Sequence, residues 1–279
     1  EPDRATDEMV LFMVMNASSV TLVPISIMTF RAQLGAKNPA DVFVPILIAT
    51  YISDLSGLLI VAAIQKLNLW NRVVLAWLGT LTLAVAALVW HFSQLSPAAV
   101  AQQSGVLANA VLIGLVASFL VAGARRRLPL YETFIEGAKE GFGVAIGIVP
   151  YLVAILVAVG VLRASGALEA FLAAIKAGVG HLNLDTRWVD AMPTALIKPL
   201  SGGGARGMMV DTMKALGADS FAGRLSCVIQ GSTETTFYVL AVYFGSVGIK
   251  KTRYALGCAL AGEFIGVLAA IGVTYLFFG

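Results

Sequence analysis

The longest uncharged stretch of the chain constrains its fold more than any other feature. Between Arg72 and Arg125, 52 consecutive residues carry no charged side chain. About a quarter of the residues in a soluble domain are charged, whereas here the share is 13% of 279 residues and 58% are hydrophobic. These values exclude a DNA-binding protein, a disordered chain, a coiled coil and a secreted disulfide scaffold. The sequence predicts an all-α, polytopic membrane helical bundle that contacts the lipid bilayer and binds no nucleic acid.

Seven segments are long and apolar enough to span a bilayer, which takes about 20 residues. They are Met9–Phe30, Val42–Ile64, Val73–Phe92, Gly105–Ala124, Phe142–Leu162, Phe221–Gly245 and Tyr254–Phe278. Arg125, Arg126 and Arg127 directly follow the fourth segment. Basic residues favour the cytoplasmic side of a membrane, so this end is predicted to be cytoplasmic. Tyr131–Gly141 is then predicted to be a short amphipathic stretch at the cytoplasmic interface.

Residues 163–220 do not have the pattern of one simple span. Trp188–Leu200 is apolar but too short to cross, a Ser-Gly-Gly-Gly segment follows at 201–204, and Met208–Leu216 has a short helical pattern. Non-helical backbone at membrane depth is tolerated where protein or a watery cavity surrounds it. Two half-length apolar pieces around a Gly-rich turn therefore predict a re-entrant hairpin.

An internal repeat relates residues 3–28 to residues 219–244, at a constant offset of 216. Each copy begins with Asp, runs through an apolar stretch to a polar cluster, and then becomes apolar again. The predicted topology gives the copies opposite directions, which is the inverted repeat of many secondary transporters. The shared composition of membrane helices is the alternative explanation. Residues 140–218 have no counterpart before the first copy, so we expect a longer gene product, a partner chain or a homo-oligomer.

The polar cluster of the second copy is the most informative segment. A carboxylate inside a bilayer costs about 2.5–3.5 kcal/mol unless it has a partner, and the glycine in this cluster allows the helix to break. We interpret the cluster as a site for a polar solute or ion, with Glu234 as a hydrogen-bond acceptor or proton carrier. Hydrogen bonding between packed helices is the alternative. The predicted binding residues here are Gln230, Ser232, Thr233, Glu234, Thr235 and Thr236.

The corresponding place in the first copy is also polar, and Pro24 follows it by one turn. Its side chains are predicted to give uncharged hydrogen bonds to the same ligand, with helix packing around a proline kink as the alternative. These residues are Asn16, Ser18, Ser19 and Thr21.

The Gly-rich segment is the second candidate for the site. Glycines let the backbone approach a ligand closely, and the helix that follows presents free N–H groups and a positive dipole end. Lys198 adds positive charge, but the segment lacks the Gly-Lys-Ser/Thr ending of a phosphate-binding Walker loop. We expect a hairpin tip that lines the solute pathway, with a tight turn as the alternative. The candidate residues are Ser201, Gly202, Gly203, Gly204 and Arg206.

Two further acids lie within predicted spans. Asp54 in the second span and Glu263 in the seventh both stand beside small residues. Together with Glu234 they are candidates for proton or cation coupling, and pairing with arginine or with the backbone is the alternative. The chain has two histidines and no Ser–His–Asp, HExxH or phosphate-loop motif, so we predict no enzyme, no cofactor and no metal site.

A family resemblance follows from these motifs. PLSGGGARGMMVDTMKALGADSF and QGSTETTFYVLAVYFGSVGIKKTRYAL closely resemble the spore maturation protein B family, and NASSVTLVPISIMTFRAQLGAKNPADVF resembles the C-terminal half of spore maturation protein A. The order resembles fused A–B proteins that carry the Gate, or nucleoside recognition, domain. The resemblance implies an A-like part at residues 1–127 and a B-like Gate domain at residues 128–279.

The function that this resemblance implies is the movement of a nucleoside-like or other small polar solute across the bacterial inner membrane. The alternative is a non-transporting scaffold or accessory protein of envelope or spore maturation. The N-terminal half of the A-type proteins has no match in this sequence.

Overall fold

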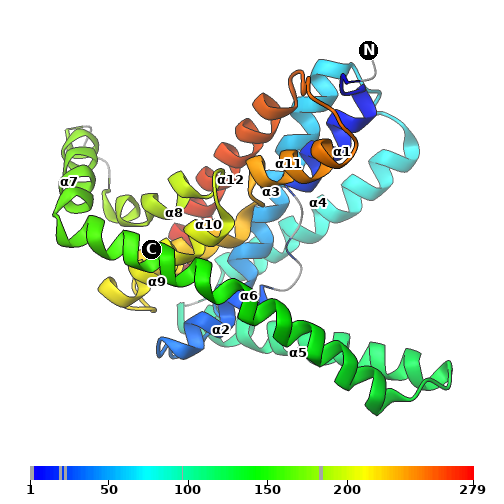
Figure 1. Cartoon of the computed structure of the whole chain (residues 1–279), viewed down its shortest axis with the longest axis horizontal. Coiled ribbons are helices and arrows are strands. Elements are labelled where there is room, and N and C mark those ends of the chain that lie inside the picture. Colours follow the sequence, from blue (N-terminus) through cyan, green and yellow to red (C-terminus); the bar gives the residue numbers. More distant parts are fainter. Residues whose placement is uncertain (1–2, 19–20, 22–23, 96, 182–184) are drawn as a thin grey trace.

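The computed structural model describes residues 3–18, 21, 24–95, 97–181 and 185–279, and all the regular elements in these ranges are helices. The prediction of an all-α protein is confirmed. Figure 1 shows the helices crossing one another around a central group, with longer helices extending outward. In chain order they are α1 (Asp7–Ala17), α2 (Ile25–Gln33), α3 (Phe43–Gln65), α4 (Arg72–Ser93), α5 (Pro97–Arg125), α6 (Leu130–Ala164), α7 (Ala167–Gly180), the 3₁₀ helix η1 (Arg187–Ala191), α8 (Met192–Ile197), α9 (Gly202–Leu216), α10 (Phe221–Ser232), α11 (Thr236–Ser246) and α12 (Ala255–Phe278).

Four helical stretches in the described ranges are long and apolar enough to cross a bilayer. They are Phe43–Gln65, Arg72–Phe92, Gln102–Arg125 and Ala255–Phe278. Helices α4 and α5 expose most of their large apolar side chains, including Trp77, Trp90 and Phe119. A soluble protein rarely exposes such a continuous apolar surface, whereas lipid tails accept it. The chain is therefore an all-α membrane protein.

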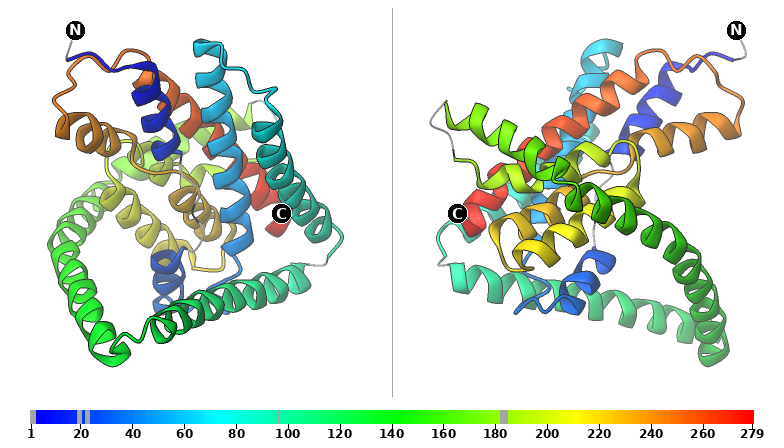
Figure 2. Two further views of the ribbon diagram at one scale, coloured as in Figure 1. Left: turned by 90° about the vertical axis from the view of Figure 1, so that its right-hand side faces the viewer. Right: turned by 60° about the vertical axis from the view of Figure 1, so that its left-hand side comes forward.

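Helix α6 corrects one prediction. The amphipathic stretch Tyr131–Gly141 is the beginning of a continuous helix of 35 residues that also contains the fifth predicted span. Glycines lower the helix propensity of this stretch. Glu136 and Lys139 stand three residues apart, however, and an opposite-charge pair at this spacing stabilises a helix. At 1.5 Å per residue the helix is about 52 Å long, which exceeds the hydrocarbon core of a bilayer. In Figures 1 and 2, α5 and α6 form two arms that meet at their connection, away from the central helices.

The first and sixth predicted spans are each divided into two half-length helices. Helix α1 ends at Ala17 and α2 begins at Ile25, while α10 ends at Ser232 and α11 begins at Thr236. The prediction of broken helices is therefore confirmed, because a polar cluster interrupts each segment. We call the second interruption, residues 233–235, the 233–235 break. Thr233 has an extended backbone there, with φ −147° and ψ 167°.

The two broken helices run antiparallel. The residues that begin the first copy contact the loop after the second: the Ala5 N–H donates to the carbonyl oxygen of Lys251 at 3.0 Å. The residues that begin the second copy contact the end of the first, where Arg31 donates to the Ala218 carbonyl oxygen at 2.6 Å. Two antiparallel copies form an inverted repeat. Equivalent turns follow α2 and α11, with positive φ values of 77° at Gly35 and 72° at Gly248 that favour glycine.

Ion pairs hold each of these contacts. In the inner clasp, which we define as Arg31, Asp41, Asp219 and Arg224, the Arg31 guanidinium lies 2.7 Å from the Asp41 carboxylate, and both side chains are fully buried. In the outer clasp, which we define as Asp7, Arg253 and Tyr254, the Arg253 guanidinium lies 2.7 Å from an exposed Asp7 carboxylate. The hydrogen bonds from Tyr254 and Arg253 hold the pKa of Asp7 below its usual range.

Helices α3 and α12 cross at small residues. A Cβ atom on Gly262 would stand 3.4 Å from the Gly57 Cα atom, and one on Gly266 would stand 2.8 Å from the Ser53 hydroxyl oxygen. Gly262 follows Ser53 by 209 positions, and Gly266 follows Gly57 by the same number. A two-fold axis that exchanges the copies would therefore turn the Gly57–Gly262 contact into the Ser53–Gly266 contact. Small residues are the usual means by which membrane helices approach closely.

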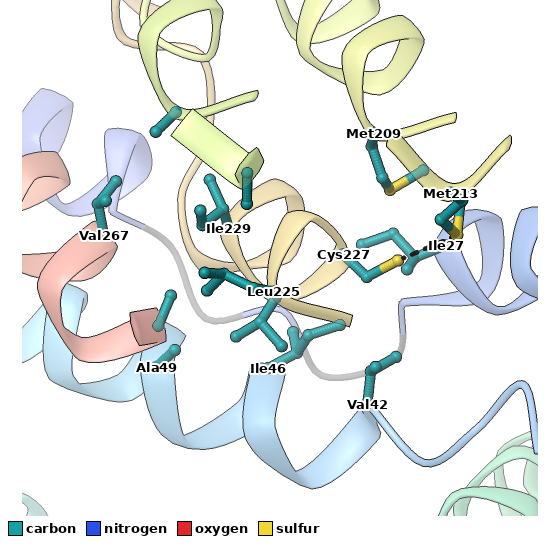
Figure 3. Close-up of a cluster of buried hydrophobic side chains, with 14 of the residues drawn as sticks. Ile27, Val42, Ile46, Ala49, Met209, Met213, Leu225, Cys227, Ile229 and Val267 are labelled. Atoms are coloured by element: carbon teal, nitrogen blue, oxygen red, sulfur yellow. Dashed lines mark hydrogen bonds between the residues drawn. The ribbon is translucent and has the colours of Figure 1, made fainter. Parts of the chain in front are cut away.

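The main hydrophobic core surrounds α10. Figure 3 shows Leu225 and Ile229 of α10 among side chains of α2, α3, α9 and α12, and Ile46 of α3 lies close to them. A Cβ atom on Gly231 would stand 2.7 Å from Ile46. Because α10 is packed on several sides, the 233–235 break at its C-terminal end is held in a fixed position.

The predicted hairpin corresponds to α8 and α9, which pack on each other through Ile197 and Gly204. The turn between them comprises residues 198–201, and the three glycines form the first turn of α9 instead of a loop. The reason is the N-cap: the Ser201 hydroxyl oxygen accepts a hydrogen bond from the Gly204 N–H at 3.0 Å. Serine at this position favours helix initiation and offsets the low helix propensity of glycine.

Candidate functional site

The interruptions of the two broken helices meet, and each satisfies backbone groups of the other. The Glu234 N–H donates to the Ala17 carbonyl oxygen, at the end of α1, at 2.9 Å. The Thr21 hydroxyl donates to the Gly231 carbonyl oxygen, near the end of α10, also at 2.9 Å. The last carbonyl groups of a helix have no partner inside it. Each broken helix thus receives a donor from the opposite copy.

The turn between α8 and α9 closes the second interruption. Lys198, whose side chain is buried, donates to the Gln230 carbonyl oxygen at 2.9 Å. The Phe237 N–H donates to the Pro199 carbonyl oxygen at 3.0 Å. A Cβ atom on Gly202 would stand only 2.6 Å from the Thr235 hydroxyl oxygen. Glycine at 202 therefore permits α9 to begin directly against the break.

A cavity of about 310 Å³ lies where these three segments come together. Its volume is at the lower end of the range for small-molecule sites. The residues that line it come from the first turn of α2, the start of α9 and the 233–235 break. They are Thr21, Pro24, Ile25, Ser26, Ile27, Lys198, Gly202, Arg206, Gln230, Gly231, Thr233, Glu234 and Thr235.

Part of the set of residues predicted from the sequence lines this cavity. Glu234 is exposed in it, and the Arg206 side chain is half-buried in its wall. The structure brings together Thr21 from the first copy, Gly202 and Arg206 from the Gly-rich segment, and Gln230, Thr233, Glu234 and Thr235 from the second copy. Residues more than 200 positions apart in the sequence thus share one cavity.

Other candidates from the first copy lie away from the cavity wall. The Asn16 amide donates to the Phe12 carbonyl oxygen at 2.7 Å and accepts a hydrogen bond from the Tyr243 hydroxyl at 3.1 Å. The Ser18 hydroxyl donates to the Val14 carbonyl oxygen at 2.9 Å. In these two positions the structure shows the helix-packing alternative. Ser19 lies outside the described residues.

The remaining candidates of the second copy and of the Gly-rich segment also have structural contacts. The Ser232 hydroxyl donates to the Ile229 carbonyl oxygen at 2.9 Å, within its own helix. Ser201 caps α9, Gly204 packs against Ile197, and Gly203 is not part of the cavity wall. Thr236 contacts one of the two acids described next.

The two acids of the long helices occupy equivalent positions. The Thr236 hydroxyl donates to Glu263 of α12 at 2.7 Å, and the Ser18 hydroxyl lies 3.4 Å from Asp54 of α3. Asp54 stands 209 positions before Glu263, as Ser53 does before Gly262. Each acid therefore accepts a hydrogen bond from a hydroxyl group at the broken helix of its own copy. The sequence analysis had left arginine or backbone partners open instead.

One buried polar atom beside the 233–235 break, the Gln230 side-chain oxygen, has no hydrogen-bond partner among the described residues. A buried polar group without a partner costs about 1–3 kcal/mol, so such a group requires an explanation. Gln230 lines the cavity, where a polar solute or water could satisfy it.

The sequence analysis missed the contribution of α2 to the cavity. Pro24, Ile25, Ser26 and Ile27 line one wall, and Pro24 is the N-cap of the helix. The sequence contains a signal for this: proline favours helix starts, whereas the sequence analysis considered Pro24 only as a kink, in the alternative explanation of the first polar cluster.

Comparisons with known proteins place the sequence in a family. The sequence model of the Gate family, described as nucleoside recognition, matches residues 145–250. Spore maturation protein B of Bacillus subtilis (strain 168) is 45% identical over 173 residues, which cover 62% of this chain and 96% of that protein. No solved protein structure matches the chain. At this identity and coverage, the chain belongs to the spore maturation protein B family.

Proposed function

We propose that this membrane protein is a secondary transporter, without enzymatic activity, that moves a small polar, nucleoside-like solute across the bacterial inner membrane. The observation that carries the proposal is the 310 Å³ cavity at the meeting point of two interrupted, antiparallel helices. Secondary transporters bind their solutes at such interfaces between inverted repeats. The match to the nucleoside recognition family supports a solute of that kind.

In this proposal Glu234 is the main solute-binding residue. Its carboxylate is exposed in the cavity while its backbone N–H is held by the Ala17 carbonyl oxygen. The carboxylate would accept hydrogen bonds from hydroxyl or N–H groups of the solute. The unpartnered side-chain oxygen of Gln230 would accept a further hydrogen bond from the solute.

Asp54 and Glu263 would couple solute binding to a proton or cation. Each accepts a hydrogen bond from a hydroxyl group at a broken helix. A change in the charge of either acid would therefore change this hydrogen bond and the backbone of the interruption beside it. The proposal also keeps the division into an A-like part, 1–127, and a B-like Gate domain, 128–279, with the proposed boundary in the connection between α5 and α6.

The test combines thermal unfolding of the purified full chain with uptake into proteoliposomes, using nucleosides, nucleobases and small anions over a range of pH. We expect at least one solute to raise the melting temperature and to be taken up. Glu234→Gln should abolish both effects, whereas Glu136→Gln, on the exposed surface of α6, should leave them unchanged.

The same measurements also have a result that would favour the non-transporting scaffold. In that case Glu234→Gln would behave as the unmodified chain does with every solute. Substitution of Ser232, Thr233 and Thr235 by alanine would lower stability or partner assembly without any solute-dependent effect.

A further inference from the structure

Three helices begin at the wall of the cavity. The lining includes the N-cap and first turn of α2, the first residue of α9, and Thr235, the N-cap of α11. The helices have 9, 15 and 11 residues. Each N-terminus carries a partial positive charge and N–H groups that point out of the helix. Three such ends at one cavity give it a positive potential that a single helix would not.

The N–H groups at two of these ends are available for a ligand. Pro24, the N-cap of α2, gives no side-chain cap, and the N–H groups of Ile25, Ser26 and Ile27 have no acceptor among the described residues. In α9 the Ser201 hydroxyl oxygen satisfies the N–H of Gly204, while the N–H of Gly202 has no such acceptor in the described ranges.

The cavity also contains a cationic side chain without an anionic partner. Within the described residues, Arg206 forms no hydrogen bond or ion pair and is not paired with Glu234. Lys198 adds a second positive charge but is already bonded to the Gln230 carbonyl oxygen. Arg206 is therefore the cation that a solute could reach.

A buried side chain provides independent evidence that a ligand belongs here. Gln230 is 8% exposed, lines the cavity, and has a side-chain oxygen without a partner in the described part of the chain. The Glu234 carboxylate, which also lines the cavity, accepts hydrogen bonds but repels anions. The cavity thus combines groups suited to a negative charge with an acceptor suited to hydrogen-bond donors.

We propose that the transported solute carries one anionic group, a phosphate or a carboxylate, which is bound between the N-termini of α2 and α9 and the guanidinium of Arg206. The neutral part of the solute donates hydrogen bonds to Glu234. This inference rests on the proposed function and specifies its substrate class. A neutral nucleoside would leave Arg206 and the helix ends without a charged partner, whereas a nucleoside monophosphate or a comparable small organic acid would satisfy both regions.

The test compares solutes that differ only in the anionic group, with calorimetry and uptake on the full chain. The probes are uridine, uridine 5′-monophosphate, uridine 5′-carboxylate and inorganic phosphate. We expect the two charged derivatives to bind about tenfold or more tightly than uridine, and the comparison between them identifies whether phosphate or carboxylate is preferred. Competition by inorganic phosphate would show that the anionic group alone is recognised.

Variants of Arg206 make the result specific. Arg206→Gln should remove the preference for the charged derivatives, and Arg206→Lys, which keeps the charge, should retain most of it. Arg126→Gln, in the exposed α5–α6 connection, is the matched control and should have no effect. The Lys variant also shows whether a loss in Arg206→Gln reflects misfolding, because both variants are compared by melting temperature without solute.

The two levels of the proposal fail in different ways. If uridine binds as tightly as its charged derivatives, depends on Glu234 and is unaffected by Arg206→Gln, the anionic subsite is wrong and the transport proposal stands. If the charged derivatives bind but are not taken up, the anionic subsite stands and transport is wrong. If none of the four probes binds, the anionic subsite is overturned, and the wider solute screen alone decides the function.

Discussion

At the scale of single residues, the Lys198 and Thr21 side chains at the cavity are bonded to backbone groups of other segments. Lys198 illustrates this. Its buried ammonium group donates to the Gln230 carbonyl oxygen, and the charges of Glu234 and Glu263 act on it. Its position therefore depends on both the turn before α9 and the end of α10.

We predict that Lys198→Met lowers the free energy of unfolding by about 1–3 kcal/mol, because it leaves the buried Gln230 carbonyl oxygen without this donor. Lys214→Met, at an exposed position of α9, is the control and should change little. Denaturation of both variants in the same detergent measures the difference. Equal stability of the two variants would show that the Lys198 contact contributes nothing.

A second prediction concerns Gly202. The Cβ atom of Gly202→Ala would stand 2.6 Å from the Thr235 hydroxyl oxygen, so α9 or the 233–235 break must shift. We expect a loss of about 1–3 kcal/mol in stability, as for other overpacked positions. Gly178→Ala in α7 meets nothing within 4 Å and should be neutral or stabilising.

If this contact causes the loss of stability, removal of the Thr235 hydroxyl group should restore it. When Thr235→Ala removes the hydroxyl group, the double variant with Gly202→Ala should recover most of the lost stability. A double variant whose losses simply add would place the effect of Gly202→Ala elsewhere. Melting temperatures of the two single variants and the double variant complete the cycle.

At the scale of helices, both clasps join the start of one copy to the end of the other, but they differ in burial. In the inner clasp Arg31 and Asp41 are completely buried, whereas in the outer clasp Arg253 is 27% and Asp7 is 53% exposed. Removal of Arg31 leaves the buried Asp41 carboxylate with Arg224 alone, at 2.9 Å, and breaking a buried pair costs up to about 5 kcal/mol. An exposed pair contributes about 1 kcal/mol or less.

We therefore predict that Arg31→Met strongly lowers the melting temperature, and that Arg253→Met, with the same change in size and charge, lowers it slightly. Differential scanning calorimetry of the two variants in one detergent compares them directly. Equal losses would contradict the difference in burial between the clasps.

The crossing of α3 and α12 gives a further prediction. Gly262→Val places its side chain against the backbone of Gly57 and should cost about 1–3 kcal/mol. Gly257→Val lies one and a half turns earlier in α12 and meets nothing within 4 Å, so it should cost less. A result in the reverse order, from thermal unfolding of both variants, would exclude a close crossing at Gly262.

Helix boundaries were predictable from the sequence where a polar cluster stands inside an apolar run. The clusters at Asn16–Thr21 and Gln230–Thr236 mark both interruptions. The pattern could not show whether such a cluster ends a helix or only lines it, because that depends on donors from the opposite copy, such as the Thr21 hydroxyl at Gly231. Gly202–Gly204 was misinterpreted as a turn because a serine cap overrides the low helix propensity of glycine.

The candidate site was predictable in part for the same reason. Glu234, Thr235 and Arg206 stand out as polar residues in apolar or Gly-rich surroundings, and they line the cavity. Asn16 and Ser232 stand out equally, yet their side chains bond to neighbouring residues. The direction of a side chain at a helix end depends on tertiary contacts, which composition does not reveal.

At the scale of the whole molecule, the two copies form the centre, α8 and α9 pack against it, and α5 and α6 extend from it. Helices α1, α2 and α3 correspond to α10, α11 and α12, and the clasps join the start of each copy to the end of the other. Helices α5 and α6 extend away as two arms (Figure 2), with most of their described apolar side chains exposed. The charge pattern predicted the antiparallel arrangement of the copies, but no periodicity in the sequence predicted the arms.

The central claim is that the two interrupted helices meet at the cavity. A disulfide measures this most directly, because it forms when two Cα atoms are about 4.4–6.8 Å apart. The background is the full chain with Cys227→Ala and Cys258→Ala, which removes both native cysteines. To this background the test adds Ala17→Cys with Glu234→Cys, the positions joined by a backbone hydrogen bond of 2.9 Å.

The control pair is Ala17→Cys with Ala218→Cys. Position 218 lies beside Arg31, at the opposite end of α10, which is about 18 Å long. Under mild oxidation in native membranes, we predict efficient cross-linking of the 17–234 pair and none of the 17–218 pair. Cross-linking of the control pair without the 17–234 pair would contradict the convergence of the two interruptions.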